Sequence, residues 1–269
     1  MILRRANNAP RVGNTFATSV EQTKTATSSD LEWFFAANAA GGDIHAQIGA
    51  ARGPSFFDVL TTEARDRFIA ACTRRRFVKG QNLFMAGQVH TANYVIESGL
   101  VQTYYQTGTG KEMTAGYRSR GEIVGGPYFF DDSGVHIWCA RAAQECDVLS
   151  ISGNDLRRIA VTERVVGDAV FHAIASKLVW DSLLLQILAT RSIRDRLTHL
   201  LVRLAVFHGE REKDTVIIRH FSHDDLANMI GASRQWVSTQ LGELRKRGTV
   251  AVTNRTIVIL RLSDLMQKA

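Results

Sequence analysis

Four polar side chains around residue 235 have the types and the spacing needed to recognise the edges of DNA bases. They are Arg234, Gln235, Ser238 and Thr239. An arginine can donate two hydrogen bonds to guanine, and a glutamine can pair with N6 and N7 of adenine. Side chains three and four residues apart share one face of a helix. Arg245 and Lys246 follow at the end of the same predicted helix, where phosphate groups of a bound duplex would lie.

The elements that would position these side chains are predicted by the segment SHDDLANMIGASRQWVSTQLGELRKR, which begins at Ser222. Ser222 is a suitable N-cap for a first helix, with two aspartates at the positive end of the helix dipole. Gly231 ends this helix, and Ser233 caps a second one. Two short helices joined through a glycine turn are typical of a helix-turn-helix. Residues 249–260 then predict a β-hairpin, which would form a wing.

The positive charge of the chain is concentrated near its C-terminal end. The formal net charge is +7, and residues 191–269 contain 14 Lys/Arg against 8 Asp/Glu. The preceding 190 residues contain 19 and 18. A basic domain beside a nearly neutral one is expected where only one of them meets phosphate. Taken by itself, the charge distribution is explained equally well by a basic face that is only exposed to solvent.

The sequence shows no pattern typical of an enzyme. It has no nucleophile–base arrangement, P-loop, dinucleotide fingerprint or metal motif. Its cysteines, Cys72, Cys139 and Cys146, form no CxxC pair. The last two fall on predicted strands, where buried and inert thiols are the usual case. We therefore expect a protein that is not an enzyme.

The location predicted for the chain is the cytoplasm. An odd number of cysteines favours a reducing compartment, and no apolar run follows the arginines of residues 1–10. The most apolar stretch, residues 169–190, is interrupted by Lys177 and Asp181, so no membrane span is expected.

The remaining patterns predict an α+β fold. Residues 1–51 are rich in small and polar residues and predict a flexible tail. Residues 52–160 begin with a helix over 54–73, and glycine-punctuated runs of β-formers then predict an antiparallel sandwich or barrel. Asn154 is the predicted N-cap of a short helix at the end of this domain. A long helix occupies residues 161–190, and the helix-turn-helix lies within residues 191–269. Residues 210–214 predict a charged turn in this last part.

The long helix has two apolar stripes. One follows a heptad spacing and consists of Phe171, Ile174, Leu178, Asp181, Leu185 and Leu188. The other consists of Val166, Val170, Ala173, Trp180, Leu184 and Ile187. We expect one stripe to pack on the chain's own domain and the other to meet a second copy. A single buried helix in a monomer is the alternative.

The order of β-domain, long helix and winged helix-turn-helix resembles the Crp/Fnr family of bacterial transcription regulators. The resemblance covers roughly residues 55–265 and is strongest at IGASRQWVSTQLGELRKRG and YVIESGLVQTYY. It implies a β-roll of the cyclic-nucleotide-binding type that acts as a sensor, and a dimerisation helix. It also implies a homodimer on pseudo-palindromic double-stranded DNA, with RNA polymerase as a further partner.

The resemblance also assigns contacts to single residues. Arg234 matches an arginine that many members place on guanine. Gln235 stands where the family usually has glutamate, and Thr239 stands where an arginine is usual, so the half-site should differ at one or two base pairs. Each altered pair is worth roughly 1–3 kcal/mol. The serines that match family contacts, one to a base edge and two to phosphates, are Ser238, Ser222 and Ser233.

Four residues mark the position of the family's sensor pocket. They are Gly125, Gly126, His136 and Ile137. In members that bind cyclic AMP, a glutamate at the position of Gly126 holds the ribose, and an Arg-Ser pair at positions 136 and 137 holds the cyclic phosphate. Isoleucine supplies neither a cation nor a donor, so the resemblance argues against tight binding of cyclic AMP.

The identity of the effector is not determined by the sequence. Residues 1–51 contain no cysteine, which argues against an Fnr-type iron–sulfur cluster. Several alternatives stay open. One is a sensing module whose cyclic nucleotide or cyclic dinucleotide controls DNA binding. The others are haem on His90, His136 or His172, a redox-sensing thiol, and regulation without any ligand.

Overall fold

The computed structural model describes residues 54–266, apart from residues 109, 111, 127, 213, 214 and 254. The tail predicted over residues 1–51 lies outside the described residues. The helices are α3 (Phe56–Val59), α4 (Thr62–Ala70), α5 (Gly153–Thr162), α6 (Arg164–Thr190), α7 (Ile193–His208), α8 (His223–Ile230), α9 (Arg234–Lys246) and α10 (Leu262–Met266). The strands are β1 (Thr73–Phe77), β2 (Asn82–Phe84), β3 (Asn93–Ser98), β4 (Val101–Gln106), β5 (Glu112–Arg118), β6 (Ile123–Val124), β7 (Cys139–Ala142), β8 (Cys146–Ile151), β9 (Gly209–Glu212), β10 (Thr215–Arg219), β11 (Val250–Thr253) and β12 (Thr256–Ile259).

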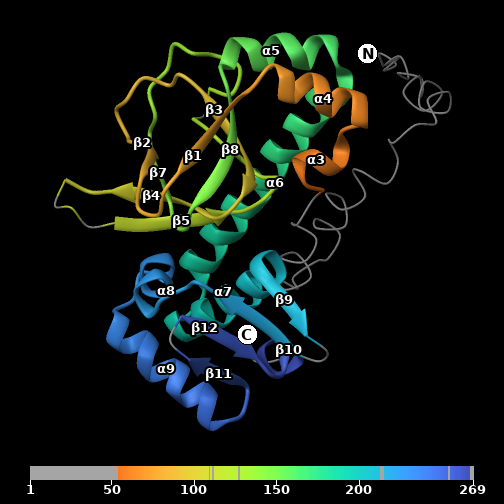
Figure 1. Ribbon diagram of the computed structural model, residues 1–269. Coiled ribbons are helices and arrows are strands. Elements are labelled where there is room, and N and C mark those ends of the chain that lie inside the picture. The colour runs from red at the N-terminus through yellow and green to blue at the C-terminus, as the bar shows by residue number, and fades with distance from the viewer. Residues whose placement is uncertain are drawn as a thin grey trace, which may run out of the picture.

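Two four-stranded antiparallel sheets form the N-terminal domain, with the strand orders β1-β8-β3-β6 and β2-β7-β4-β5. Alternate side chains of each strand point between the sheets, as the period of two along a strand requires. The core between the sheets includes Phe77, Leu83, Phe84, Tyr94, Ile96, Val101, Val124, Ala140, Cys146 and Val148. The predicted β-domain is therefore confirmed as a roll of two sheets (Figure 1).

Helices cover the outer face of the first sheet. The side chains of Val95 and Leu149 point to this face, opposite to their neighbours in the strands. They pack with Phe68 of α4, Leu156 of α5 and Val170 of α6, all of which are buried. Because α6 belongs to this cluster, its first half is fixed to the β-roll.

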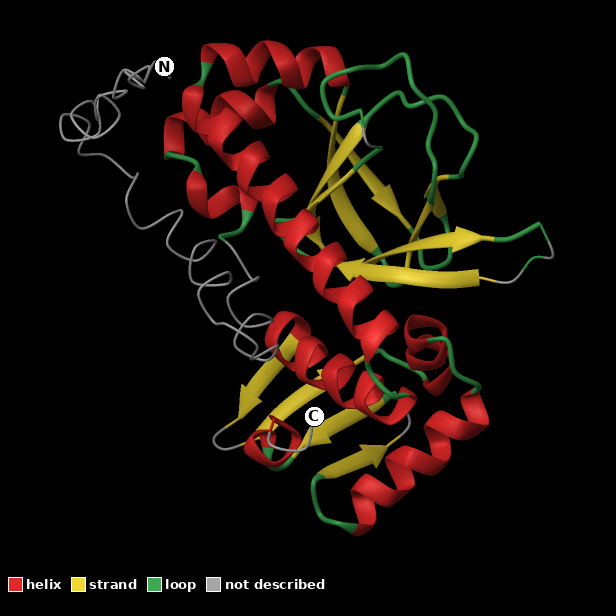
Figure 2. Ribbon diagram, turned by 180° about the vertical axis from the view of Figure 1, so that it is seen from behind, coloured by secondary structure: helices red, strands yellow, loops and turns green. Residues whose placement is uncertain are grey.

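Helix α6 runs on from the β-roll to the C-terminal domain (Figures 1 and 2). The stripe that includes Val166, Val170 and Trp180 is buried, whereas Leu178 and Leu185 of the other stripe are 64% and 69% exposed. One stripe thus packs within the chain and the other is left uncovered, as the sequence predicted. By length and composition α6 could also cross a membrane. However, its buried stripe packs on both domains, and the ion pair between Lys177 and Asp181 lies in its middle.

The C-terminal domain combines α7, α8 and α9 with a four-stranded antiparallel sheet of order β11-β12-β10-β9. Its core includes Leu197, Leu201, Leu204, Ile218, Leu226, Ile230, Val237, Leu241, Ile257 and Ile259. The hairpin of β11 and β12 follows α9 directly. The predicted wing is therefore confirmed, although its turn residue 254 lies outside the described residues.

The structure corrects several predicted local features. The helix expected over residues 54–73 is broken into α3 and α4, because Thr61 caps a new helix by accepting a hydrogen bond from the backbone N–H of Ala64. Helix α5 is capped by Ser152 and not by Asn154. The charged turn expected at residues 210–214 begins instead with strand β9, which pairs with β10.

Candidate nucleic-acid interface and sensor pocket

The helix-turn-helix is built from local capping interactions. Ser222 begins α8 with a capping box, in which its hydroxyl accepts from the N–H of Asp225 and Asp225 accepts from the N–H of Ser222. Gly231 ends α8 in the left-handed conformation, with φ of 71°. Ser233 caps α9 by accepting from the N–H of Trp236. Because glycine alone adopts this conformation without a steric penalty, Gly231 sets the angle between the two helices.

The first turns of α9 present the predicted base-reading side chains to solvent. Arg234 has a 71% exposed side chain, which is paired with Asp224 of α8 at 3.7 Å. Gln235 and Thr239 are exposed beside it. The hydroxyl of Thr239 donates to the backbone oxygen of Gln235, so its methyl group is the part that remains for contact. Arg245 is exposed at the far end of the helix.

Three further predicted contact residues also have side-chain partners within the chain. Ser238 is half-buried, and its hydroxyl lies 2.6 Å from Nδ1 of His223. The hydroxyl of Ser222 donates to the carboxylate of Asp225 at 2.5 Å. Lys246 is paired with Glu243 at 2.9 Å. Contact with DNA would have to compete with these interactions, whereas Ser233 and Arg245 are exposed.

The wing adds a cation that the sequence did not single out as a contact residue. Arg255 has a half-exposed side chain and lies 3.5 Å from the carboxylate of Asp225. The only signal for it in the sequence is its place in the predicted turn of the wing. Arg255 therefore lies beside the N-terminal end of α8, the first helix of the helix-turn-helix.

A hydrogen bond connects the β-roll to the helix-turn-helix. The hydroxyl of Tyr117 on β5 donates to Oδ1 of Asp225 at 2.9 Å. The Tyr117 ring packs edge-on against Phe221, with 4.8 Å between the ring centroids. Burial and the charge of Asp225 raise the pKa of the Tyr117 hydroxyl, so this group stays protonated and remains a donor. The same carboxylate thus closes the cap of α8 and joins it to the β-roll.

The residues predicted to mark the sensor pocket are only partly brought together. Gly125 adjoins Asn93, whose Oδ1 would lie 2.1 Å from any Cβ at this position. Gly126 lies against the rings of His90 and His136. His136 is buried and stacks on Phe84 at 3.7 Å, so it faces the core of the roll. Ile137 is the exception, because its side chain is 53% exposed and lies outside this cluster.

The space beside Gly125 is small. A cavity of about 30 Å³ lies there, lined among others by Arg118, Trp138, Lys177 and Asp181. Lys177 lies 5.1 Å from the centre of the Trp138 ring and is paired with Asp181. One water needs about 10–15 Å³ on this scale, so the space has room for water molecules and is too small for a nucleotide. The residues present do not fit a cyclic nucleotide.

The thiols and potential metal ligands do not form a cofactor site in the described part of the chain. Among those residues no group of three or more His, Cys, Asp or Glu side chains could hold a metal ion. Burial raises the pKa of the Cys72 thiol to about 12 and that of Cys146 to about 11. Thiols that stay protonated are poor nucleophiles, as expected for buried and inert cysteines.

Burial of His136 predicts a loss of stability in mild acid. Desolvation, with a smaller contribution from His90, lowers the pKa of His136 from 6.5 to about 4. Between these pH values the unfolded chain binds a proton that the folded chain does not, so stability falls as the pH drops below 6.5. We expect this group to lower the free energy of unfolding by about 2 kcal/mol between pH 7 and pH 5. The variant His136→Phe preserves the stacking on Phe84 but has no group that titrates. In denaturant unfolding, it should therefore not show the part of the stability loss between pH 7 and pH 5 that is due to His136. If the free energy of unfolding of His136→Phe fell as much as that of the wild type between pH 7 and pH 5, the loss could not be assigned to His136.

Comparisons with known proteins agree with this architecture. Residues 74–163 match the family model described as a cyclic nucleotide-binding domain, and residues 195–268 match the Crp-like helix-turn-helix domain. The chain is 26% identical over 223 residues to the anaerobic regulatory protein of Bacillus subtilis, covering 80% of this chain and 90% of the relative. It is 26% identical over 194 residues to the fumarate and nitrate reduction regulatory protein of Escherichia coli strain K12, covering 71% and 76%.

Solved structures share the fold. A CooA mutant from Carboxydothermus hydrogenoformans has a TM-score of 0.64 at 20% identity, over 74% of this chain and 88% of that one. The c-di-GMP responsive regulator CLP of Xanthomonas campestris has a TM-score of 0.62 at 23% identity, over 74% and 99%. The fold and the site define a DNA-binding transcription regulator with a winged helix-turn-helix. The chain belongs to the Crp/Fnr family, whose members are transcription regulators.

Proposed function

We propose that the protein is a homodimeric, cytoplasmic regulator that recognises pseudo-palindromic DNA without cyclic AMP. The observation that carries the proposal is the first turns of α9, where Arg234, Gln235 and Thr239 are exposed together on a firmly capped helix. A helix that enters the major groove reads base edges with the side chains of its N-terminal turns. Arg234 supplies two hydrogen-bond donors for a base edge, Gln235 supplies an amide, and Thr239 supplies a methyl group.

The exposed stripe of α6 supports the homodimer. Phe171, Ile174, Leu178 and Leu185 are 37% to 69% exposed and recur at heptad spacing. Exposed apolar side chains that recur at heptad spacing on a long helix are the pattern of a coiled-coil seam, which Asp181 interrupts at one position. Two copies joined along α6 would place two α9 helices in successive major grooves, about 34 Å apart.

We assign the contacts within one half-site by side-chain type. Arg234 reads guanine and Gln235 reads adenine. Ser233, Arg245 and Lys246 contact phosphates, which position the helix without reading sequence. Ser222 and Ser238 contact DNA only if they give up their present hydrogen bonds. These bonds join Ser222 to Asp225 and Ser238 to His223. RNA polymerase is the further partner that a transcription regulator of this family requires.

The geometry of the β-roll supports regulation without cyclic AMP. At Gly126 there is no carboxylate for a ribose, and His136 faces the core instead of a phosphate. The cavity of about 30 Å³ between the roll and α6 is also too small for a cyclic dinucleotide. Any effector of this protein therefore binds elsewhere or is of another kind.

The test of the proposal is selection of bound sequences from a random DNA pool with the ligand-free protein. We expect enrichment of an inverted repeat whose half-site contains both a guanine and an adenine. The half-site centres should lie one helical turn apart. A folded and dimeric protein that enriches no sequence would contradict binding without an effector, and enrichment of a single unrepeated site would contradict the dimer.

A further inference from the structure

A buried arginine with no hydrogen-bond acceptor lies where the two domains meet. The side chain of Arg203, on α7, has no exposed surface. Within the described residues, none of its three guanidinium nitrogens has a hydrogen-bond partner. Its guanidinium carbon lies 3.3 Å from the centre of the Trp180 ring. The ring attracts the cation, but it offers no acceptor for five N–H groups.

A second guanidinium lies beside it. Arg118, at the end of β5, has a side chain that is only 9% exposed. Nη2 of Arg203 and Nη1 of Arg118 lie 3.4 Å and 3.7 Å from the point where a Cβ on Gly116 would be. The nearest carboxylate is that of Glu122, 3.4 Å from Arg118. That carboxylate already accepts from the backbone N–H and the hydroxyl of Ser119. Asp181 is the other carboxylate that acts on Arg203, and it is already paired with Lys177. Neither carboxylate is free to pair with Arg203.

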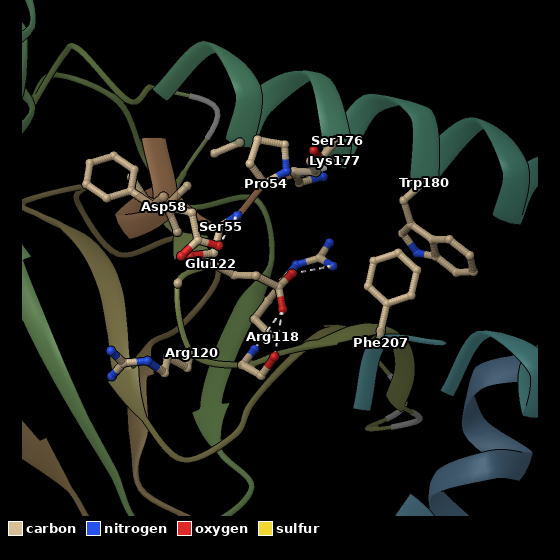
Figure 3. Close-up of a pocket in the computed structure, with 15 residues that line it drawn as sticks. Pro54, Ser55, Asp58, Arg118, Arg120, Glu122, Ser176, Lys177, Trp180 and Phe207 are labelled. Carbon is tan, nitrogen blue, oxygen red and sulfur yellow. Dashed lines mark hydrogen bonds and ion pairs between the residues drawn. The ribbon is translucent and has the colours of Figure 1, made fainter. Parts of the chain in front are cut away.

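A cavity of about 180 Å³ opens directly in front of Arg118. Figure 3 shows Arg118 and Glu122 on one side of it and the rings of Trp180 and Phe207 on the other. Lys177 and the hydroxyls of Ser119 and Ser176 also line it. Its other acid, Asp58, accepts from the backbone N–H of Ser55. Gly125, Gly126 and His136, which mark the family's sensor pocket, do not line this cavity, although Arg118 and Lys177 also border the small cavity beside Gly125.

The unsatisfied groups around this cavity are all donors. Trp180 lines the cavity, and its Nε1 is buried without a partner. The three unpartnered nitrogens of Arg203 do not reach the cavity wall, because this side chain is fully buried and packs on the Trp180 ring. Burial and the nearby charge of Arg118 lower the pKa of Arg203, which shows how unfavourable the uncompensated charge is here. A buried charge with no partner is strongly destabilising, and an anion that binds beside it offsets that cost.

We propose that this cavity binds a small oxyanion, a carboxylate or a phosphate, that pairs with Arg118 while Arg203 supplies the positive charge behind it. The volume limits the ligand, because a cavity of about 150 Å³ accommodates benzene. Inorganic phosphate or a short dicarboxylate fits this volume, and a nucleotide does not. The aromatic walls formed by Trp180 and Phe207 suit the carbon skeleton of an organic acid.

The position of the site makes the oxyanion an effector, and this part of the inference rests on the proposed function. The lining comes from the β-roll, from α6 and, through Phe207, from α7 of the DNA-binding domain. Tyr117, which donates to Asp225 of the helix-turn-helix, directly precedes Arg118. An oxyanion that draws Arg118 and α7 together changes the placement of α8 and α9, so the affinity for DNA should depend on its concentration.

The experiment is calorimetric titration of the full chain with inorganic phosphate and, separately, with succinate, at constant ionic strength set with chloride. We expect saturable binding of at least one of them. Arg118→Met should weaken it by about tenfold or more, since hydrogen bonds to charged groups are the strong ones. Ser176→Leu, which fills the cavity and removes no charge, should weaken it as well. Arg158→Met removes the same charge from an exposed position on α5 and should leave binding unchanged.

The melting temperature gives a second readout. Without an oxyanion, Arg203→Met should melt at a higher temperature than the wild type, because an apolar side chain replaces an unpaired buried charge. With the oxyanion, the wild type should gain stability and Arg203→Met should gain much less. Absence of saturable binding to the wild type would overturn the proposal, and so would wild-type affinity in both Arg118→Met and Ser176→Leu.

Binding of the selected DNA, measured by fluorescence anisotropy with and without the oxyanion, separates the two proposals. If the protein binds its DNA repeat but no oxyanion, only the present inference fails. If it binds the oxyanion but no specific DNA, the site stands and the proposed function fails.

Discussion

Leu185→Arg should convert the protein to a monomer and remove most of its affinity for an inverted DNA repeat. The side chain of Leu185 is 69% exposed on the stripe that we assign to the dimer. In a two-fold dimer the substitution brings two arginines together within an apolar seam, where charges are not solvated. Without the second subunit, DNA affinity should fall by about 10²–10⁴, which is the gain that linked binding sites provide. Sedimentation at tens of micromolar protein and binding to whole and half sites measure both effects.

The matched control is Val161→Arg. Val161 is 81% exposed at the end of α5, outside the stripe. This variant should remain a dimer and bind the repeat like the wild type. A Leu185→Arg protein that sediments as a dimer would show that the subunits meet on another surface.

Arg234→Ala should weaken binding to the selected DNA repeat far more than binding to random DNA. The side chain of Arg234 is 71% exposed at the first position of α9, and its only ion pair in the described structure is with Asp224. Loss of a bidentate contact to guanine costs about 1–3 kcal/mol for each half-site, and the preference for that base should disappear. Competition titrations with specific and random DNA at fixed salt measure the difference.

Arg245→Ala is the matched control for this prediction. Arg245 is exposed at the opposite end of the same helix. As a phosphate contact, it should weaken binding to all sequences alike and reduce the salt dependence. Equal losses on both kinds of DNA for Arg234→Ala would mean that Arg234 contacts phosphate and reads no base.

The features that could be predicted from the sequence depend on short-range rules. Ser222, Gly231 and Ser233 are cap positions, and a cap is decided by the few residues around it. The two stripes of α6 follow from the helical repeat, and the structure buries one and exposes the other. The helical repeat alone was also enough to predict which side chains share the polar face of α9.

The features that could not be predicted depend on contacts between distant parts of the chain. Arg203 lies on α7 one turn after His199, which is also buried, and sequence alone gives no sign that an arginine there is fully buried. The bond from Tyr117 to Asp225 joins residues that are 108 positions apart. Ser238 was expected to face DNA, but His223 holds its hydroxyl because α8 and α9 pack together. Strand β9 was read as a turn because its charged side chains hide the backbone pairing with β10.

The bond between Tyr117 and Asp225 has a consequence for how this protein could be recombined with its relatives. A chimera that joins this C-terminal domain to another β-roll at the end of the long helix would treat the two domains as separable. In this chain, a graft of residues 191–269 onto a foreign roll would leave Asp225 facing whatever that roll carries at the end of β5. A functional graft therefore has to carry Tyr117 along with the DNA-binding domain. The segment to be exchanged then includes part of β5, which lies more than 70 residues before the junction.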